Sequence, residues 1–311
     1  MSVDPHLARI LELMSGAPPL SAGTAEQARA GLRFATVELR DPATLPQVAS
    51  VEESSYLGEA GPLRARVYRP EADGPVPTVL FAHGGGYVMG DVETHDPQAR
   101  LLCREVGAVV VSVDYRLAPE HPFPAGHLDV VAALRHVVAT VDQLGGDPTR
   151  VAVAGDSAGG NLVGGAAVVA RDEGLPLRAQ LLLYPSTDFR AEEEQVAHAS
   201  RHTEGEGYLL TRDDMLWFRD QYQAVRHDPR ASLLLQPDLA GLAPAVIATA
   251  EHDPLRDEAE HYATLLAAAG VPVVARRYDG LVHGFLGLSH VHDPSHKAAL
   301  QVCQDLKELL A

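Results

Sequence analysis

Short apolar runs alternate with longer helix-like stretches from about Thr78 onward. The runs are rich in β-branched residues and end in glycine or polar residues, as do strands that are buried on both faces of a parallel sheet. They span residues 76–84, 107–115, 150–157, 179–185, 244–253 and 271–279. The stretches between them predict helices over residues 125–144, 157–174 and 257–270. The pattern therefore predicts an α/β fold with a mostly parallel central sheet flanked by helices.

The chain before this alternation has a different pattern. Residues 48–58 and 63–70 alternate polar and apolar positions on either side of Gly61-Pro62, which predicts an antiparallel hairpin at the start of the sheet. Residues 1–45 look helical and begin with an amphipathic stretch. We expect one catalytic domain over residues 46–311, with residues 1–45 as a helical cap segment outside the sheet.

A second irregular stretch interrupts the alternation between Ser186 and about Leu235. It holds an acidic segment, a turn at Gly205 and Gly207, and a helix candidate over residues 212–222. Insertions of this size at strand ends usually contribute to a site. We therefore expect residues 186–235 to form a helical cap insertion.

Composition narrows the range of partners. Hydrophobic residues make up 46% of the 311 residues and charged residues 22%, a balance typical of a folded protein with a full core. The net charge of -17 disfavours binding to nucleic acid or to anionic membranes. No apolar run approaches the roughly 18 residues of a membrane span, and the start of the chain does not resemble a secretory signal, so we expect a cytoplasmic protein. Cys103 and Cys303 lack paired spacing and are expected to be free, buried thiols.

The sequence Gly155-Asp156-Ser157-Ala158-Gly159 matches the G-x-S-x-G pattern of a nucleophilic serine. It follows a predicted strand and opens a helix of small residues, which is the setting that this pattern requires. The glycines leave room for a sharp turn that exposes the serine, and the first turn of the helix offers N–H groups to an oxyanion. A chance match in a glycine-rich chain is the alternative, and the strand–turn–helix setting argues against it.

A glycine-rich loop, His83-Gly84-Gly85-Gly86, stands at the carboxyl end of the first parallel strand. Loops at that edge of an open α/β sheet face the ligand crevice, and glycine backbone can approach an oxyanion closely. An HGGG loop is the usual companion of the serine elbow, and its N–H groups act beside that of the residue after the nucleophile, here Ala158. A phosphate-binding loop is the alternative, but neither Gly-Lys-Ser/Thr nor G-x-G-x-x-G is present there.

An acid and then a histidine follow the serine in the chain order of such hydrolases. Asp253 closes a predicted strand and is better placed than Asp188, which begins the insertion. His283 lies just past the last predicted strand, and Gly284 after it suits a loop that brings an imidazole over Ser157. We therefore predict Ser157 as nucleophile, Asp253 as the orienting acid and His283 as the general base.

Three further histidines, His290, His292 and His296, have a spacing that resembles a set of metal ligands. They lie in a predicted loop that leads into the C-terminal helix. The serine chemistry requires no cofactor, and we expect neither a metal nor another cofactor.

Taken together, the motifs resemble those of the hormone-sensitive-lipase-like bacterial esterases, a family with the α/β-hydrolase fold. The resemblance extends over most of the chain from about Val76 to Phe285. It covers the sequences HGGGYVMGD (83–91), DYRLAPEHPFPA (114–125), GDSAGGN (155–161), LLLYP (181–185), DPLRDE (253–258) and HGF (283–285), all in the family's order.

This resemblance implies the same triad of Ser157, Asp253 and His283. It assigns the oxyanion hole to the N–H groups of Gly85, Gly86 and Ala158. It further implies a cap built from the N-terminal segment and the insertion, and a possible homodimer formed through the edge of the sheet.

The DYRLAPE sequence (114–120) is interpreted as a structural support beneath the oxyanion loop. Pro119 makes this segment rigid, and we expect Arg116 and Glu120 to form an ion pair.

These features predict a serine carboxylesterase that cleaves a small-molecule ester through an acyl-enzyme. We expect Tyr87, Trp217 and Phe285 to contact the substrate. The apolar cluster at 215–218 either closes over the acyl group or packs within the cap, and a bounded pocket of the family's kind favours acyl groups of roughly two to eight carbons. One alternative is an amidase, formamidase or deacetylase for a specific metabolite. Another is a non-catalytic receptor, against which the intact His283 argues.

Overall fold

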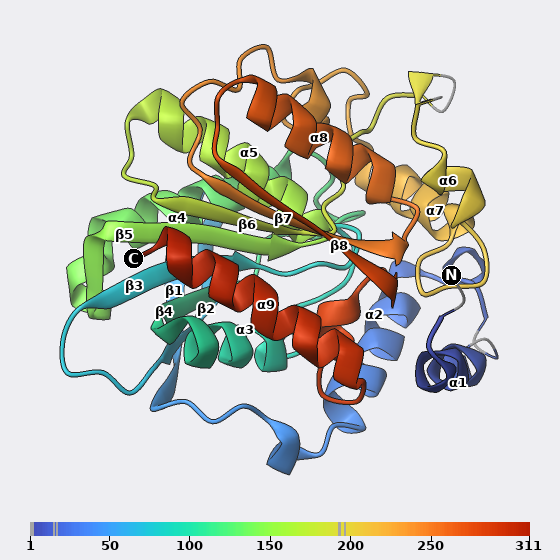
Figure 1. The fold of residues 1–311 in the computed structure, drawn as a ribbon, viewed down its shortest axis with the longest axis horizontal. Coiled ribbons are helices and arrows are strands. Elements are labelled where there is room, and N and C mark those ends of the chain that lie inside the picture. Colours follow the sequence, from blue (N-terminus) through green and yellow to red (C-terminus); the bar gives the residue numbers. More distant parts are fainter. Residues whose placement is uncertain (1–2, 15, 17, 192–193, 196) are drawn as a thin grey trace.

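The computed structural model of the protein describes residues 3–14, 16, 18–191, 194–195 and 197–311. Its strands are β1 (Ser50–Gly58), β2 (Gly61–Arg69), β3 (Val76–Ala82), β4 (Val109–Val113), β5 (Gly146–Asp156), β6 (Ala179–Leu183), β7 (Ala245–His252) and β8 (Val273–Val282). They form one eight-stranded sheet in the order β1-β2-β4-β3-β5-β6-β7-β8 (Figure 1). The β1–β2 and β2–β4 pairs are antiparallel, and the pairs from β4 to β8 are parallel. The predicted mostly parallel sheet is therefore confirmed.

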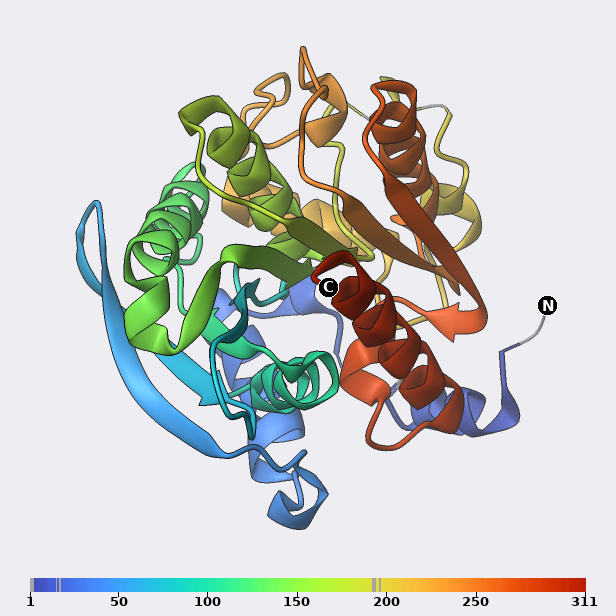
Figure 2. The same ribbon diagram turned by 60° about the vertical axis from the view of Figure 1, so that its left-hand side comes forward.

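The predicted hairpin is also present, with a small shift of its turn. Gly58 pairs with Gly61 and Leu57 with Pro62, so Glu59 and Ala60 form the turn in place of Gly61-Pro62. Figure 2 shows this hairpin curving away from the parallel strands, as the twist of a large sheet requires.

Helices cover both faces of the sheet. They are α1 (Pro5–Met14), α2 (Ala25–Arg33), α3 (Asp96–Leu102), α4 (Ala125–Leu144), α5 (Ala158–Glu173), α6 (Ser200–Thr203), α7 (Arg212–Tyr222), α8 (Arg256–Ala268) and α9 (Asp293–Leu309). In Figure 1, α4, α5 and α8 lie on one face, and α3 and α9 on the other. The predicted helices at 125–144, 157–174, 212–222 and 257–270 are therefore confirmed, with Gly174 and Gly270 in the left-handed conformation at helix ends.

The core follows the alternation of side chains along the strands. In β3, Leu80 and Ala82 pack toward α4 and α5, whereas Val79 and Phe81 pack toward α3 and α9. Successive residues of a strand point to opposite faces, so a strand covered on both sides is apolar throughout. Cys103 and Cys303 lie buried in the second cluster as free thiols, as predicted.

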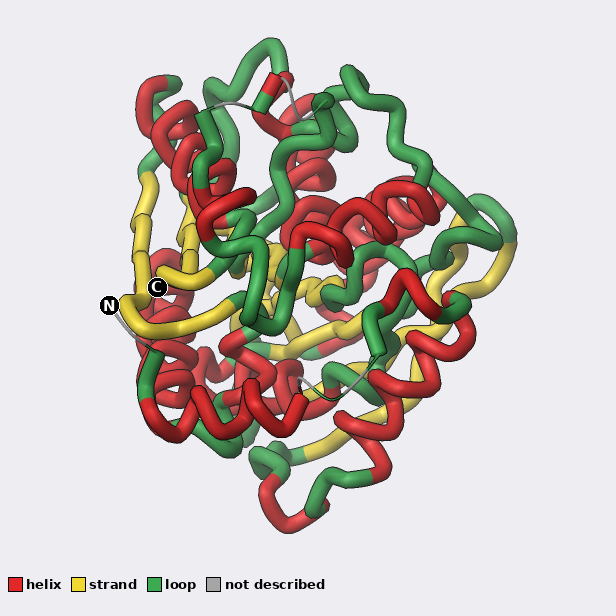
Figure 3. The backbone as a smooth tube through the Cα atoms, turned by 90° about the vertical axis from the view of Figure 1, so that its right-hand side faces the viewer, coloured by secondary structure: helices red, strands yellow, loops and turns green. Residues whose placement is uncertain are grey.

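Two segments far apart in the chain meet at the carboxyl ends of the parallel strands. One holds α1, α2 and the short 3-10 helix η1 (Leu20–Ala22), and the other holds α6 and α7. η1 contacts α7, and both segments lie on the right-hand side of Figure 1, which Figure 3 turns toward the viewer. None of the helices in the described part of the chain has both the length and the apolar character that spanning a membrane requires.

Candidate active site

Ser157 occupies a strained turn between β5 and α5. Its backbone has φ of 54° and ψ of -117°, and its N–H donates to the Leu183 carbonyl at 2.8 Å. A Cβ on Gly155 would lie 2.4 Å from the Gly159 carbonyl oxygen, and one on Gly159 would lie 2.0 Å from the Ala82 carbonyl oxygen. Both glycines are therefore required by close backbone contacts, and the turn lifts the serine out of the sheet.

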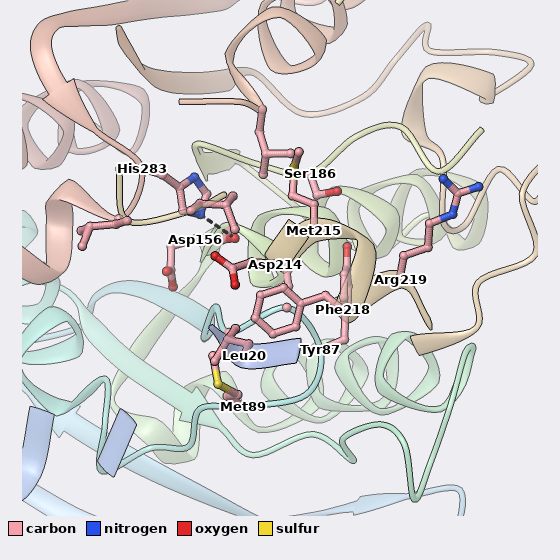
Figure 4. Close-up of a pocket in the computed structure, with 18 of the residues that line it drawn as sticks. Leu20, Tyr87, Met89, Asp156, Ser186, Asp214, Met215, Phe218, Arg219 and His283 are labelled. Atoms are coloured by element: carbon pink, nitrogen blue, oxygen red, sulfur yellow. Dashed lines mark hydrogen bonds between the residues drawn. The ribbon is translucent and has the colours of Figure 1, made fainter. Parts of the chain in front are cut away.

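His283 connects Ser157 to Asp253 by two hydrogen bonds. His283 Nε2 lies 2.9 Å from Ser157 Oγ, and the dashed line at His283 in Figure 4 marks a hydrogen bond to a residue of the pocket. His283 Nδ1 lies 2.8 Å from Asp253 Oδ2. The carboxylate can only accept, so the imidazole proton is on Nδ1 and Nε2 accepts the hydroxyl proton of Ser157. Asp253 is fully buried, and its Oδ1 accepts the Leu255 N–H at 2.8 Å, which holds the carboxylate in place. The structure thus brings together the three residues predicted as the triad.

Two aromatic rings pack in series against His283. The edge of Tyr184 packs against His283 with ring centres 4.9 Å apart, and Phe285 packs against Tyr184 at 5.0 Å. Phe285 is fully buried in the core and does not line the pocket. Phe285, predicted from the sequence as a substrate contact, is not placed on the pocket wall: Gly284 has φ of 77° and turns the chain, so the next side chain points into the core.

The HGGG loop lies beside the serine. The Gly84 N–H donates to Asp156 Oδ1 at 2.8 Å, which anchors the loop to the residue before the nucleophile. Gly85 and Gly86 have φ of 112° and 61°, a region that favours glycine. Both line the pocket together with Ser157 and Ala158, and Ala158 begins a helix whose first N–H groups have no intrahelical partner.

The segment at 114–120 contacts the HGGG loop through Tyr115. The Tyr115 hydroxyl donates to the His83 carbonyl at 2.8 Å, and the two rings stack with centres 4.4 Å apart. Burial lowers the pKa of His83 to about 4, so this histidine is neutral near neutral pH.

The predicted ion pair between Arg116 and Glu120 is wrong. Arg116 Nε lies 2.8 Å from Asp129 of α4, and Glu120 pairs with Arg29 of α2 at 2.6 Å. A spacing of four residues brings side chains together on a helix, but residues 116–120 form a loop and turn. Arg29 also donates to the carbonyls of Val88 and Ala118, so the N-terminal segment is bound to the residues that follow the HGGG loop and to the segment at 114–120.

A cavity of about 250 Å³ lies over Ser157. Its floor consists of the strand ends and the HGGG loop, and Tyr87, predicted from the sequence as a substrate contact, lines it. Its apolar walls come from both irregular segments and from neighbouring loops: Leu20, Leu32, Met89, Phe189, Leu209, Leu210, Met215, Phe218 and Leu255. The pocket is therefore mostly apolar and is bounded by the segments at 5–45 and 186–235.

Trp217, also predicted from the sequence as a substrate contact, does not line this pocket. Asp214, Met215 and Phe218 share the face of α7 that borders the pocket, as their spacing on a helix requires. Trp217 lies on another face and packs into the core with only 9% of its surface exposed. Phe218 covers Gly86 directly, since a Cβ on Gly86 would lie 2.2 Å from the Phe218 ring.

A buried polar network behind the pocket was not predicted. Glu258 of α8 is fully buried, accepts the Thr187 N–H at 2.7 Å and forms an ion pair with Arg201 of α6. Burial raises the pKa of Glu258 to about 7, although Arg201 opposes this shift. Asp188, the alternative acid of the triad, pairs with Arg190 at 2.8 Å instead. The sequence did contain a signal for this network: Glu258, the last residue of DPLRDE, is a charged residue on the side of a helix that faces the core.

His290, His292 and His296 do not converge on one point. The His292 side chain accepts a hydrogen bond from the Ser295 N–H and caps α9. Among the residues that the structure describes, no group of three or more His, Cys, Asp or Glu side chains is arranged to hold a metal ion.

The comparisons with known proteins agree with this geometry. Residues 79–287 match the family described as the α/β-hydrolase fold. The carboxylesterase NlhH of Mycobacterium tuberculosis is 40% identical over 99% of this chain and 96% of that protein. The carboxylic ester hydrolase LipN of the same organism is 48% identical over 78% of this chain but only 66% of its own length. An esterase structure from Pyrobaculum calidifontis is 40% identical over 99% of both chains, with a TM-score of 0.91. The chain therefore belongs to the α/β-hydrolase-fold family, and within it to the hormone-sensitive-lipase-like esterases whose motifs it shares.

Proposed function

We propose that this protein is a serine carboxylesterase that hydrolyses esters with short to medium acyl chains. The observation that carries the proposal is the hydrogen-bonded series from Ser157 through His283 to Asp253 at the floor of an apolar pocket. The names of similar proteins support it, since NlhH is a carboxylesterase and a protein of Pseudomonas putida that is 34% identical over its whole length is an ethyl acetate hydrolase.

In the first half of the reaction, Ser157 Oγ attacks the ester carbonyl while His283 Nε2 takes the hydroxyl proton. The negative charge that develops on the carbonyl oxygen is stabilised by the N–H groups of Gly85, Gly86 and Ala158. His283 then donates its proton to the departing alcohol, and the acyl group stays on Ser157.

In the second half, His283 Nε2 takes a proton from water as the water oxygen attacks the acyl carbonyl. His283 then returns this proton to Ser157 Oγ as the bond between Oγ and the acyl carbon breaks, which releases the acid and regenerates Ser157. Asp253 accepts the hydrogen bond from Nδ1 throughout and stabilises the imidazolium that forms in each half. No step of this cycle calls for a cofactor.

The segments at 1–45 and 186–235 act as the cap in this proposal. Their described residues supply most apolar walls of the pocket, and a bounded apolar pocket limits the acyl chain that it can hold. Each methylene adds about 0.8 kcal/mol of binding only until the space is filled. The cytoplasmic location and the homodimer stay predictions.

A series of 4-nitrophenyl esters from acetate to palmitate tests the proposal. We expect kcat/KM to rise to a maximum between roughly two and eight acyl carbons and to fall beyond it. A maximum at the longest chains would contradict the bounded pocket. Measuring a matched ester and amide in parallel separates the esterase from the amidase alternative.

A further inference from the structure

Most polar side chains that line the pocket have partners within the protein. Asp156 accepts the Gly84 N–H, Asp188 pairs with Arg190, Asp214 accepts the Thr211 hydroxyl, and Arg201 pairs with Glu258. The hydroxyls of Tyr87 and Ser186 lie next to one another on the pocket wall and have no charged partner of this kind.

The Tyr87 hydroxyl is buried, and among the residues that the structure describes none makes a hydrogen bond of normal geometry with it, although the Ser186 side chain is close enough to act on its pKa. The side chain is 4% exposed and borders the pocket. Burial raises the pKa of Tyr87 well above its ordinary value, so the phenol is protonated and able to donate. In Figure 4 the hydroxyl points toward the region of the pocket where Ser186 lies.

The surroundings of Tyr87 hold its ring in one position. Its ring stacks on Tyr222 with centres 3.8 Å apart and planes 7° apart, and the edge of Phe189 packs against it at 5.7 Å. Its backbone has φ of 64°, which is costly for a bulky residue, and the Ala118 N–H donates to its carbonyl at 2.9 Å. Phenylalanine would pack equally well there, so packing does not explain the hydroxyl.

Ser186 is held with similar precision close to the nucleophile. Its N–H donates to the Ser157 carbonyl at 3.3 Å, and its own carbonyl accepts from Asn161 Nδ2 at 2.9 Å. Its hydroxyl can both donate and accept, whereas the protonated phenol of Tyr87 offers a strong donor. A hydroxyl or carbonyl oxygen of a ligand beside Ser186 would find both groups.

We propose that Tyr87 and Ser186 form a polar subsite for a hydroxyl or carbonyl oxygen of the substrate, a few bonds from the scissile ester. This inference rests on the proposed esterase function and narrows its substrate class to oxygenated esters. Beside a plain alkyl chain the Tyr87 hydroxyl has only the Ser186 hydroxyl next to it, whereas an oxygenated chain offers it an acceptor of its own. Sites built to hydrogen-bond a substrate hydroxyl discriminate strongly against analogues that lack it.

The test compares kcat/KM for matched esters by titration of the released acid. On the acyl side, methyl butyrate is compared with methyl 2-hydroxybutyrate and methyl 3-hydroxybutyrate. On the alcohol side, propyl butyrate is compared with 2-hydroxyethyl butyrate. The two arms identify the part of the substrate that carries the oxygen, and taking ratios between variants removes the intrinsic reactivity of each ester.

We expect Tyr87→Phe to lower the ratio of oxygenated to plain ester by about tenfold for at least one pair. Ser186→Ala should lower the ratio for the same pair, which keeps the test valid if Tyr87→Phe fails to fold. Tyr222→Phe is the matched control, because it removes a second buried and unpaired hydroxyl from the ring stacked on Tyr87, outside the pocket.

An unchanged ratio in Tyr87→Phe and Ser186→Ala for every pair would overturn the inference and leave the esterase function intact. An equal loss in Tyr222→Phe would overturn it as well, since packing and not the subsite would then control selectivity. A wild-type protein that cleaves none of the esters would contradict the proposed function itself.

Discussion

The triad residues follow the ends of β5, β7 and β8, whereas the pocket walls come largely from short helices and loops of two segments far apart in the chain. The strand ends are held by the hydrogen bonds of the parallel sheet. The walls are held by side-chain ion pairs and hydrogen bonds, such as those of Arg29 with Glu120 and Arg201 with Glu258. This difference suggests that the sheet carries the chemistry and the two segments select the ester.

The largest effect is expected at the nucleophile. Ser157→Ala should lower kcat by on the order of a millionfold, because no other group can form the acyl-enzyme. Circular dichroism and thermal unfolding should show a folded protein. Ser55→Ala, on the exposed face of β1, is the control and should keep wild-type kcat. Retention of a tenth of the activity in Ser157→Ala would disprove the assignment.

The second effect separates the two candidate acids. Asp253→Asn should lower kcat by about ten-thousandfold, because the amide no longer holds His283 in the tautomer that accepts from Ser157. Asp188→Asn removes a contact to Arg190 and none to His283, so its loss in kcat should be far smaller. Equal losses of kcat in the two variants would contradict the assignment of Asp253, at the end of a strand, and not Asp188, in the insertion, as the acid of the triad.

Acid stability should respond to a histidine outside the pocket. Burial lowers the pKa of His127, on α4, from 6.5 to about 4. The unfolded chain takes up the proton first, so stability is full above pH 6.5 and falls as the pH drops toward 4, by about 3 kcal/mol for this one group. Urea unfolding at pH 4 and pH 7 gives the loss in the free energy of unfolding between the two pH values. We expect this loss to be smaller in His127→Gln than in the wild-type protein by about that amount. An unchanged difference would mean that His127 is not neutral in the fold.

A smaller effect is expected where the two regions touch. Gly86→Ala should lower kcat by about a hundredfold, because its methyl group displaces the oxyanion loop from Phe218. Adding Phe218→Ala should restore part of the loss by relieving that contact. Gly74→Ala is the control, since a Cβ there meets nothing within 4 Å. Failure of the double variant to recover any activity would show that backbone strain alone causes the loss.

The smallest effect concerns chain length. Phe218→Ala enlarges the pocket and should shift the preferred 4-nitrophenyl ester toward longer acyl chains, by about 0.8 kcal/mol in relative kcat/KM for each methylene newly accommodated. Trp217→Ala should lower the melting temperature without moving the preference, because this ring packs in the core. An equal shift of the preferred acyl chain length in both variants would mean that the position of the whole helix α7, and not the Phe218 side chain, sets the preference.

Much of the catalytic framework could be predicted from the sequence because it depends on residues that are close to one another in the chain. A strand covered on both faces needs a continuous apolar run, and the serine turn needs glycines at neighbouring positions. Asp253 follows such a run at the end of β7, and His283 comes just after β8, an edge strand with exposed charged residues, so their place at one edge of the sheet followed from the parallel order of the strands. The structure brings them to within hydrogen-bond distance of one another and of Ser157.

The sequence by itself determined the strands, the helices and the residues that can perform the chemistry, since each depends on neighbours within a few positions. Only the tertiary structure decided which side chains meet across the pocket: Arg116 with Asp129, Glu258 with Arg201, and Phe218 over Gly86. Trp217 and Phe218 are adjacent in the chain, yet one enters the core and the other covers the oxyanion loop. Such contacts depend on how α7 is rotated against the sheet, and that rotation is set by packing between distant segments.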